Sequence, residues 1–276
     1  MWAGRLAPTP RPVRHSRPLV RSGIARVSET ILFNQADGIA QLTFNHPARR
    51  NALGAPELAA IEAALKALSA DSRVLMITSA DPRVFCAGAD ITQILEGALS
   101  GERWQMVTNQ IADLPIPTIA VLSGNVFGGG VELAMSCDFR LAREDITMRI
   151  PAAAIGLCYP VMGIERLTRR LGINLAKRAL VAAESFSGES LLALGLVDSL
   201  HSEDSLAEAA EGYARSLLEL APMSVATMLH LIRQLEIGGY DRVAADAMAQ
   251  RCAQSEDLQE GLKAMREKRR PVFRNA

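Results

Sequence analysis

Residues 124–141 read GNVFGGGVELAMSCDFRL and predict a glycine turn followed by a short helix. The apolar run 118–122, which has the length of a buried strand, leads directly into this stretch. The glycines Gly128–Gly130 then indicate a turn, and residues 131–135 are typical of a short buried helix. The first N–H groups of a helix have no partner within it, so they would face outward here. Such a turn can bind a ligand. The alternative explanation for its glycines is tight packing of the turn against its neighbours.

A second segment, Phe85–Asp90 (FCAGAD), has the same character, because small residues follow a strand-like run and Ile91 can begin a helix. Small side chains let a ligand approach the main chain closely. Together the two segments predict a pair of backbone donors that converge on one oxygen, as needed to stabilise an enolate or a tetrahedral oxyanion. Neither segment has the spacing of a phosphate-binding loop. The chain also lacks a GxSxG elbow, which argues against a serine hydrolase.

The flanking sequence alternates between strand-like and helix-like patterns. Strands are predicted over residues 39–44, 74–79, 138–142 and 147–150. A helix is predicted over residues 56–69, where apolar residues recur every three or four positions, and the pattern after Pro160 is almost entirely helical. This order favours an α/β fold in which a layered core is followed by a helical region.

Composition and charge exclude several classes of protein. The 276 residues are 49% hydrophobic and 22% charged, which is typical of an ordinary globular protein. Thirty basic side chains balance thirty acidic ones, so the net charge gives no reason to expect a nucleic-acid partner. The longest uncharged stretch, Leu114–Val131, is interrupted by prolines and glycines and predicts no membrane span. Four cysteines and four histidines are scattered, which argues against a zinc site or disulfide framework and favours a reducing compartment.

Residues 1–28 differ from the rest of the chain. They contain six arginines, four prolines and no acidic residue, which predicts a disordered extension. An Arg-rich leader without acids is also typical of a mitochondrial transit peptide, although the prolines oppose the amphipathic helix that such a peptide forms. We therefore expect a cytoplasmic protein, with the mitochondrial matrix as the alternative.

Four motifs resemble those of the crotonase, or enoyl-CoA hydratase/isomerase, superfamily. They are HPARRNAL at residues 46–53, FCAGADI at 85–91, GNVFGGGVELAMSCDFRL at 124–141 and EGLKAMREKRRPVF at 260–273. The resemblance implies an α/β fold with a crotonase-like ββα spiral core over residues 29–200 and a C-terminal helical trimerisation region over residues 201–276. It also implies a homotrimer, or a homohexamer made of two trimers.

The same resemblance implies roles for particular residues. The backbone N–H groups of Ala89 and Gly129 would form the oxyanion hole for the thioester carbonyl of an acyl-CoA substrate, and Glu132 would be the acid or base. Further residues would bind the substrate and its coenzyme A, namely Arg49, Arg50, Ala52, Ala87, Asp90 and Ile91. Solvated surface positions are the alternative for the two arginines. No metal and no permanently bound cofactor are expected, and coenzyme A enters only as part of the substrate.

One position departs from the family pattern. Hydratases of this family carry a second catalytic glutamate, and the spacing back from Gly156 places Ala152 there. Hydration uses two carboxylates to hold and activate water, whereas isomerisation needs one base, so we expect double-bond isomerisation over hydration. Cys158, Tyr159 and Glu165 are candidate substitutes. We expect Glu165 to be a surface ion-pair partner and Tyr159 to be a buried structural residue.

Other interpretations are compatible with the same residues. Glu132 could be a structural partner of a neighbouring arginine. A catalytically weak acyl-CoA-binding or scaffold protein would also lack the second glutamate. RNA binding through a basic surface is a third possibility, which the zero net charge argues against.

Overall fold

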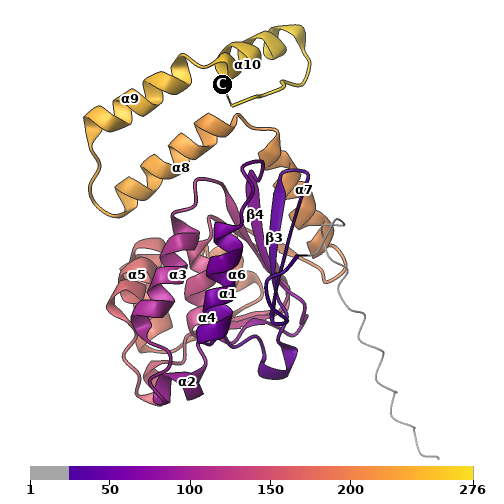
Figure 1. Cartoon of the computed structure of the whole chain (residues 1–276). Coiled ribbons are helices and arrows are strands. Elements are labelled where there is room, and N and C mark those ends of the chain that lie inside the picture. The colour runs from indigo at the N-terminus through magenta and orange to yellow at the C-terminus, as the bar shows by residue number, and fades with distance from the viewer. Residues whose placement is uncertain (1–24, 276) are drawn as a thin grey trace, which may run out of the picture.

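The computed structural model describes residues 25–275, which form two β-sheets with helices on both sides (Figure 1). The strands are β1 (Ala25–Arg26), β2 (Ile31–Ala36), β3 (Ile39–Phe44), β4 (Val74–Ser79), β5 (Val84–Cys86), β6 (Thr118–Leu122), β7 (Asn125–Phe127), β8 (Phe139–Arg143), β9 (Thr147–Arg149), β10 (Ser185–Ser187) and β11 (Ser199–His201). The larger sheet has the order β1-β2-β3-β4-β6-β8-β11, and the smaller sheet has the order β10-β9-β7-β5.

Ten α-helices lie within the described residues. They are α1 (Ala55–Lys66), α2 (Ile91–Leu95), α3 (Gly101–Ala112), α4 (Gly129–Ser136), α5 (Val161–Ala176), α6 (Glu189–Ala193), α7 (Leu206–Leu218), α8 (Pro222–Glu236), α9 (Arg242–Ala253) and α10 (Glu256–Glu267). Shorter helical segments are the 3-10 turns η1 (Pro47–Arg49) and η2 (Ala153–Ile155) and the π-helical η3 (Lys177–Val181).

Consecutive strands divide between the two sheets in a repeating way. β4, β6 and β8 are parallel neighbours in the larger sheet, and the strand that follows each of them, β5, β7 or β9, lies in the smaller sheet. A helical segment follows each such strand pair. This is a ββα repeat, and it confirms the predicted α/β class and spiral core.

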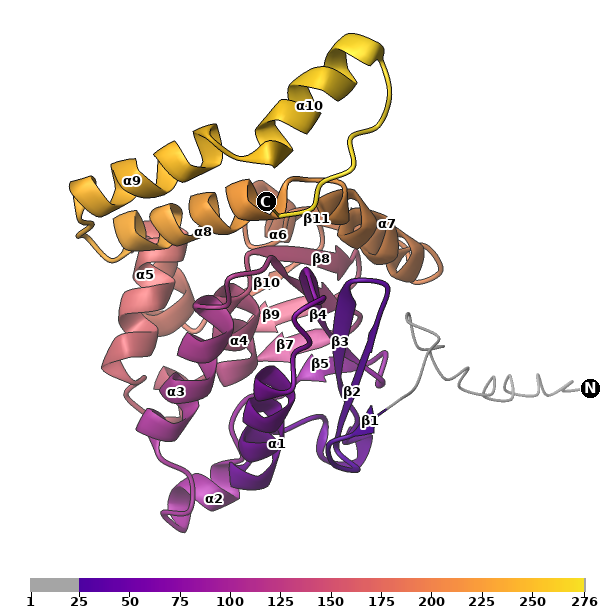
Figure 2. The same ribbon diagram turned by 45° about the horizontal axis from the view of Figure 1, so that its top comes forward.

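The larger sheet is covered on both faces, and this explains the apolar pattern of its central strands. In β4, Leu75 and Ile77 belong to the main core, whereas Val74 and Met76 pack with α7 in a second core. Successive side chains of a strand point to opposite faces. A strand that is covered on both faces is therefore buried at every position, and all six residues of β4 are buried, the first four of them apolar. Figure 2 shows α1, α3, α4 and α5 on one side of the sheets and α7 on the other.

Most of the predicted elements are confirmed, with small differences at their ends. The strands over residues 39–44, 74–79 and 118–122 match the structure residue for residue. The helix predicted over residues 56–69 ends earlier, at Lys66. The side-chain amide of Gln35 bonds the carbonyl of Ala67 and the N–H of Ser69, which replaces the next helical turn.

The prediction of an almost entirely helical chain after Pro160 is wrong in two places. β10 and β11 each contain three residues, which is too short for an apolar period to be visible. They form because partner strands are already in place. β10 pairs antiparallel with β9, and β11 pairs parallel with β8.

The last three helices extend beyond the sheets as a separate layer (Figure 1). Arg233 of α8 attaches this layer to the core, because its guanidinium pairs with Asp138 at 3.1 Å and donates to the carbonyl of Leu114. Arg170 of α5 also pairs with Glu236 at 2.8 Å. On α10 three apolar side chains at three- and four-residue spacings are exposed, namely Leu258, Leu262 and Met265 by 40%, 37% and 69%.

Residues 1–24 lie outside the described residues, so the expectation of a disordered or targeting extension is untested there. Ala25–Arg26 form β1, which pairs antiparallel with β2. Among the helices of residues 25–275, none is long and apolar enough to cross a membrane.

Candidate active site

The turn that begins α4 places a free backbone donor beside a buried aromatic ring. Gly129 is the first residue of the helix, and its N–H finds no intrachain acceptor among the described residues. Its α-carbon lies against the indole of Trp104 from α3, so closely that a side chain at this position would overlap the ring. Glycine at position 129 is therefore needed for the contact between α3 and α4.

The segment that follows β5 lies directly against this turn. Leu53 forms an isolated parallel bridge with Ala89, in which Leu53 N–H donates to Gly88 and Asp90 N–H donates to Leu53, each at 2.9 Å. The N–H of Ala89 takes no part in this bridge. Gly88 has φ +91° and lies so close to the next segment that a β-carbon would be 2.7 Å from the nitrogen of Gly129. The structure thus brings together the two glycine-rich segments that the sequence singled out.

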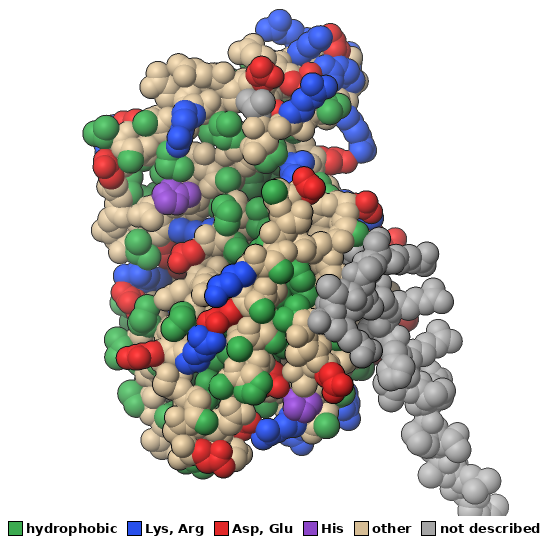
Figure 3. Space-filling view, viewed as in Figure 1, with side chains coloured by type: hydrophobic (Ala, Val, Ile, Leu, Met, Phe, Trp, Pro, Cys, Tyr) green, Lys and Arg blue, Asp and Glu red, His purple; other side chains and the backbone are tan. Residues whose placement is uncertain are grey.

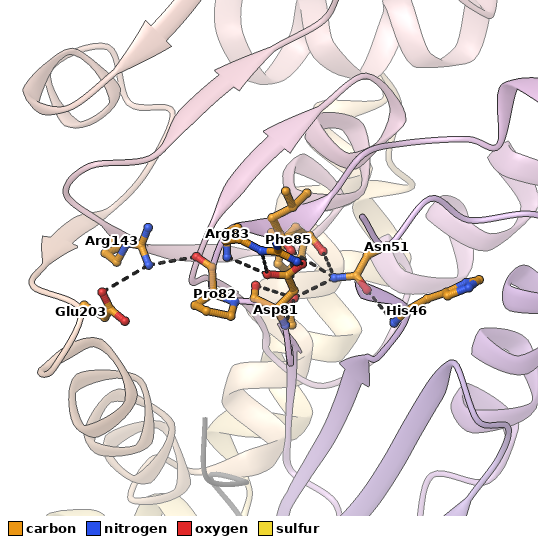
Figure 4. A network of polar contacts seen from close by, with 10 residues as sticks. His46, Asn51, Asp81, Pro82, Arg83, Phe85, Arg143 and Glu203 are labelled. Atoms are coloured by element: carbon orange, nitrogen blue, oxygen red, sulfur yellow. Dashed lines mark hydrogen bonds and ion pairs between the residues drawn. The ribbon is translucent and has the colours of Figure 1, made fainter. Parts of the chain in front are cut away.

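A buried asparagine holds the second segment in position (Figure 4). Asn51 Nδ2 donates to Ser79 Oγ at 2.7 Å and to the carbonyls of Val84 and Phe85 at 3.1 Å. Its Oδ1 accepts from the N–H of His46 at 2.8 Å. Asn51 is fully buried. Asn51 of the HPARRNAL motif therefore links β4 to β5 by hydrogen bonds. The sequence did not predict this role.

Glu132 lies one helical turn after Gly129 and is completely buried. Its Oε1 accepts from Gln105 Nε2 at 2.7 Å and from Thr108 Oγ1 at 3.5 Å, and its Oε2 accepts from the hydroxyl of Tyr159 at 2.8 Å. Arg166 Nε lies 3.9 Å from Oε1. Both oxygens are thus occupied by donors from other helices or loops.

The pKa of Glu132 is raised above its usual value, chiefly because burial disfavours the charged carboxylate. Hydrogen bonds from Tyr159 and Gln105, the positive charge of Arg166 and a hydrogen bond from Thr108 oppose this shift and lower the pKa in part. A carboxyl group with a raised pKa and several donors around it is suited to accept and release a proton.

The position predicted for the second glutamate lies directly before a short helical turn. Ala152 precedes η2, is 6% exposed and contributes to the main core. Glu165 pairs with Arg169 on the surface of α5, as predicted. Cys158 is exposed. Tyr159 is half-buried and reaches Glu132, a contact that the sequence did not predict.

The residues expected to bind coenzyme A divide between residues 49–52 and residues 87–91, and they differ in exposure. Arg49 and Arg50 are exposed, Ala52 and Ala87 are half-buried, and Ile91 is 56% exposed. Arg49 pairs with Asp90 at 2.9 Å. Asp90 is buried, and it also accepts from the N–H of Thr92 and the amide of Gln93, so its carboxylate caps α2.

Sequence reasoning did not identify the residues of α3 and α5 that surround Glu132. Thr108 lies three residues after Gln105 and four after Trp104, so the three side chains share one face of α3. The signal that could have identified them is the presence of two polar residues, Gln105 and Thr108, on a helix face that is otherwise apolar. Arg166 belongs to α5, and nothing in its local sequence distinguishes it from the other arginines.

Comparisons with known proteins agree with this geometry. A family model described as enoyl-CoA hydratase/isomerase matches residues 34–276. Enoyl-CoA hydratase domain-containing protein 2, mitochondrial, from Bos taurus is 36% identical over 250 residues, which cover 86% of this chain and 84% of the relative. Methylglutaconyl-CoA hydratase, mitochondrial, from Mus musculus is 32% identical over 253 residues, which cover 86% and 80% of the two chains.

A solved structure leads to the same family. The crystal structure of a putative enoyl-CoA hydratase/isomerase family protein from Hyphomonas neptunium superposes with a TM-score of 0.83 at 30% sequence identity, covering 90% of this chain and 98% of that one. The chain therefore belongs to the enoyl-CoA hydratase/isomerase family of acyl-CoA enzymes and has the crotonase fold.

Proposed function

We propose that this protein binds the thioester carbonyl of an acyl-CoA between the N–H groups of Ala89 and Gly129 and uses Glu132 as its acid and base. The observation that carries the proposal is the placement of a free N–H and a buried carboxyl group on one helix, a single turn apart. The helix dipole of α4 adds positive potential at Gly129, where negative charge would develop on the carbonyl oxygen.

Isomerisation is the reaction that suits a single carboxylate. Glu132 would remove a proton from C2 of a 3-enoyl thioester, and the electron pair would move into the carbonyl to give an enolate. The same carboxyl group would then return the proton at C4, which leaves the double bond between C2 and C3. Isomerisation consumes no water. The lack of a second carboxylate at Ala152 would therefore lower the rate of isomerisation less than the rate of hydration.

Coenzyme A would enter as part of the substrate, with its phosphates near the exposed guanidinium group of Arg50 and near Arg49, which would exchange its ion pair with Asp90 for a phosphate. We also propose that the chain works as a trimer, or as a hexamer of two trimers. Met228, Ile232 and Leu235 lie along one face of α8 and are exposed by 55%, 61% and 59%. Neighbouring copies would bury this face, since contiguous exposed apolar surface is uncommon on a monomer.

The experiment is a comparison of matched 3-enoyl-CoA and 2-enoyl-CoA thioesters with the wild type, Glu132→Gln and Glu62→Gln. Glu62 is a suitable control because it is also a buried glutamate, and it pairs with Arg103 at 2.6 Å outside the site. We expect conversion of the 3-enoyl thioester, a loss of about 10²- to 10⁴-fold in Glu132→Gln, and no comparable loss in Glu62→Gln. Faster hydration of the 2-enoyl thioester would contradict the preference for isomerisation.

A weak acyl-CoA-binding protein is the second candidate, because Glu132 is sealed from solvent and no second carboxylate is present at Ala152. Such a protein would bind acyl-CoA with the same affinity in the wild type and in Glu132→Gln, and neither would turn the thioesters over. Calorimetric titration of both proteins with a saturated acyl-CoA separates the two candidates.

A further inference from the structure

The carboxylate of Glu132 is held differently at its two oxygens. Oε1 is bonded by side chains of α3, from Gln105 and Thr108, and faces Arg166 of α5. Oε2 receives a single described hydrogen bond, from the hydroxyl of Tyr159 at 2.8 Å. Removing the Tyr159 hydroxyl would leave Oε2 without its only described partner, whereas Oε1 would keep both of its hydrogen bonds.

The backbone around Tyr159 is shaped to allow this bond. Tyr159 precedes Pro160, the cap of α5, and the first turn of that helix contains Gly163. A β-carbon at Gly163 would lie 2.5 Å from Cε1 of Tyr159 and 2.9 Å from Oε2 of Glu132. The ring and the carboxylate can therefore meet only because position 163 has no side chain.

The direction of the hydrogen bond follows from the charges. Burial, together with the negative charge of Glu132, raises the pKa of Tyr159 well above 10, so the hydroxyl keeps its proton. Tyr159 consequently acts as a donor and Glu132 as the acceptor. The groups that face the carboxylate from the elements packed around it are Gln105 and Thr108 from α3, Arg166 from α5, and Tyr159, beside which Cys86 of β5 also lies.

We propose that Tyr159 is a positioning residue that replaces the missing second carboxylate as the partner of Glu132 and aims Oε2 at the acyl chain. This inference rests on the proposed function and goes beyond it, because it assigns a role to a residue outside the four family-like motifs. Tyr159 transfers no proton in this scheme. Its hydroxyl holds the carboxylate in one orientation, and the bond strengthens whenever Glu132 is ionised.

The test compares Tyr159→Phe with the wild type and with Tyr213→Phe in the full-length protein. Tyr213 packs edge-on against Phe139 at the second core, so this control removes the same hydroxyl far from Glu132. We would measure kcat and KM for a 3-enoyl thioester across pH. In Tyr159→Phe we expect kcat to fall roughly tenfold or more with KM changed less than twofold, because a hydrogen bond to a charged group is lost.

The pH profile separates positioning from simple packing. Loss of a donor that favours the charged form raises the pKa of Glu132 further. The rise of kcat with pH should therefore occur at higher pH in Tyr159→Phe and stay in place in Tyr213→Phe. An unchanged profile, with kcat within twofold of the wild type, would overturn the proposal.

A readout that does not depend on turnover keeps the two proposals distinguishable. The infrared carbonyl band of protonated Glu132 can be identified by its absence in Glu132→Gln and titrated in each variant. A midpoint that moves upward in Tyr159→Phe supports the positioning role even if no thioester is converted, in which case only the proposed function fails. A midpoint that does not move overturns the positioning role.

Discussion

Substitution of Gly163 by alanine gives a sharp test of how the site is packed. The new β-carbon would lie 2.5 Å from Tyr159 Cε1, whereas ordinary contact begins at 3.4 Å, so the ring must retreat by 3.4 − 2.5 = 0.9 Å. If the ring moves back along the line of its hydrogen bond to Glu132, the distance from the Tyr159 hydroxyl to Oε2 increases from 2.8 Å to about 3.7 Å. This is too long for a hydrogen bond. Glu132 Oε2, at 2.9 Å from the same β-carbon, would be displaced as well.

The expected loss of stability follows from these contacts. Overpacking of a tight site costs about 1–3 kcal/mol, and loss of a hydrogen bond to a charged group costs about 1.5–3 kcal/mol. Alanine is favoured over glycine within a helix by about 1 kcal/mol, which offsets part of this. We expect Gly163→Ala to lower the free energy of unfolding by about 1.5–5 kcal/mol and to lower kcat at least tenfold.

The assay pairs urea unfolding with turnover of a 3-enoyl thioester, and it has a matched control. Gly212 is also inside a helix, α7, and a β-carbon there would meet no atom within 4 Å. Gly212→Ala should therefore be neutral or slightly stabilising and fully active. If Gly163→Ala is as stable and as active as Gly212→Ala, the close approach of Tyr159 to Glu132 is not part of the working protein.

Three further predictions concern the pH dependence of stability, the buried Asn51 and the reactivity of the cysteine thiols. Because folding raises the pKa of Glu132 above 4.5, the free energy of unfolding should fall as pH rises from 4.5 through the raised value, and urea titrations of Glu132→Gln should lack this contribution. Asn51→Ala removes the two amide hydrogens that serve three acceptors inside the core and should destabilise by about 2–3 kcal/mol; a loss under about 1 kcal/mol would contradict the network of Figure 4. Burial raises the pKa of both Cys86 and Cys137 to about 12, so at pH 8 an alkylating reagent should label exposed Cys158 first and the two buried thiols only after unfolding, as mass spectrometry would show.

The charged surface bears on the remaining alternative, RNA binding. Figure 3 shows Lys and Arg side chains gathered most densely over the end of α10, next to acidic ones. Arg269 there pairs with Glu260 and Glu267 at 2.6 Å, and Arg270 pairs with Glu219 at the same distance. Cations that are already paired contribute little to binding phosphates, so this surface does not favour an RNA partner.

Local patterns predicted the elements of the site well. The start of α2 at Ile91, a short helix at the Gly128–Gly130 turn and the three central strands follow from glycine turns and apolar periods, which act over a few residues; α4 begins at Gly129, two residues before the predicted helix. Errors occurred where a distant group decided the outcome, as at Lys66, where Gln35 of β2 bonds the residues that follow the helix.

By itself, the sequence determined the α/β order, the two segments with small residues and glycines, and a carboxylate, Glu132, one helical turn after Gly129. Only the tertiary structure decided what surrounds that carboxylate. Tyr159 and Gln105 each lie 27 positions from Glu132, and they reach it because α3 and the loop before α5 pack against α4. Periodicity reports which face of a helix is buried, whereas the partner of a buried polar group depends on which element covers that face.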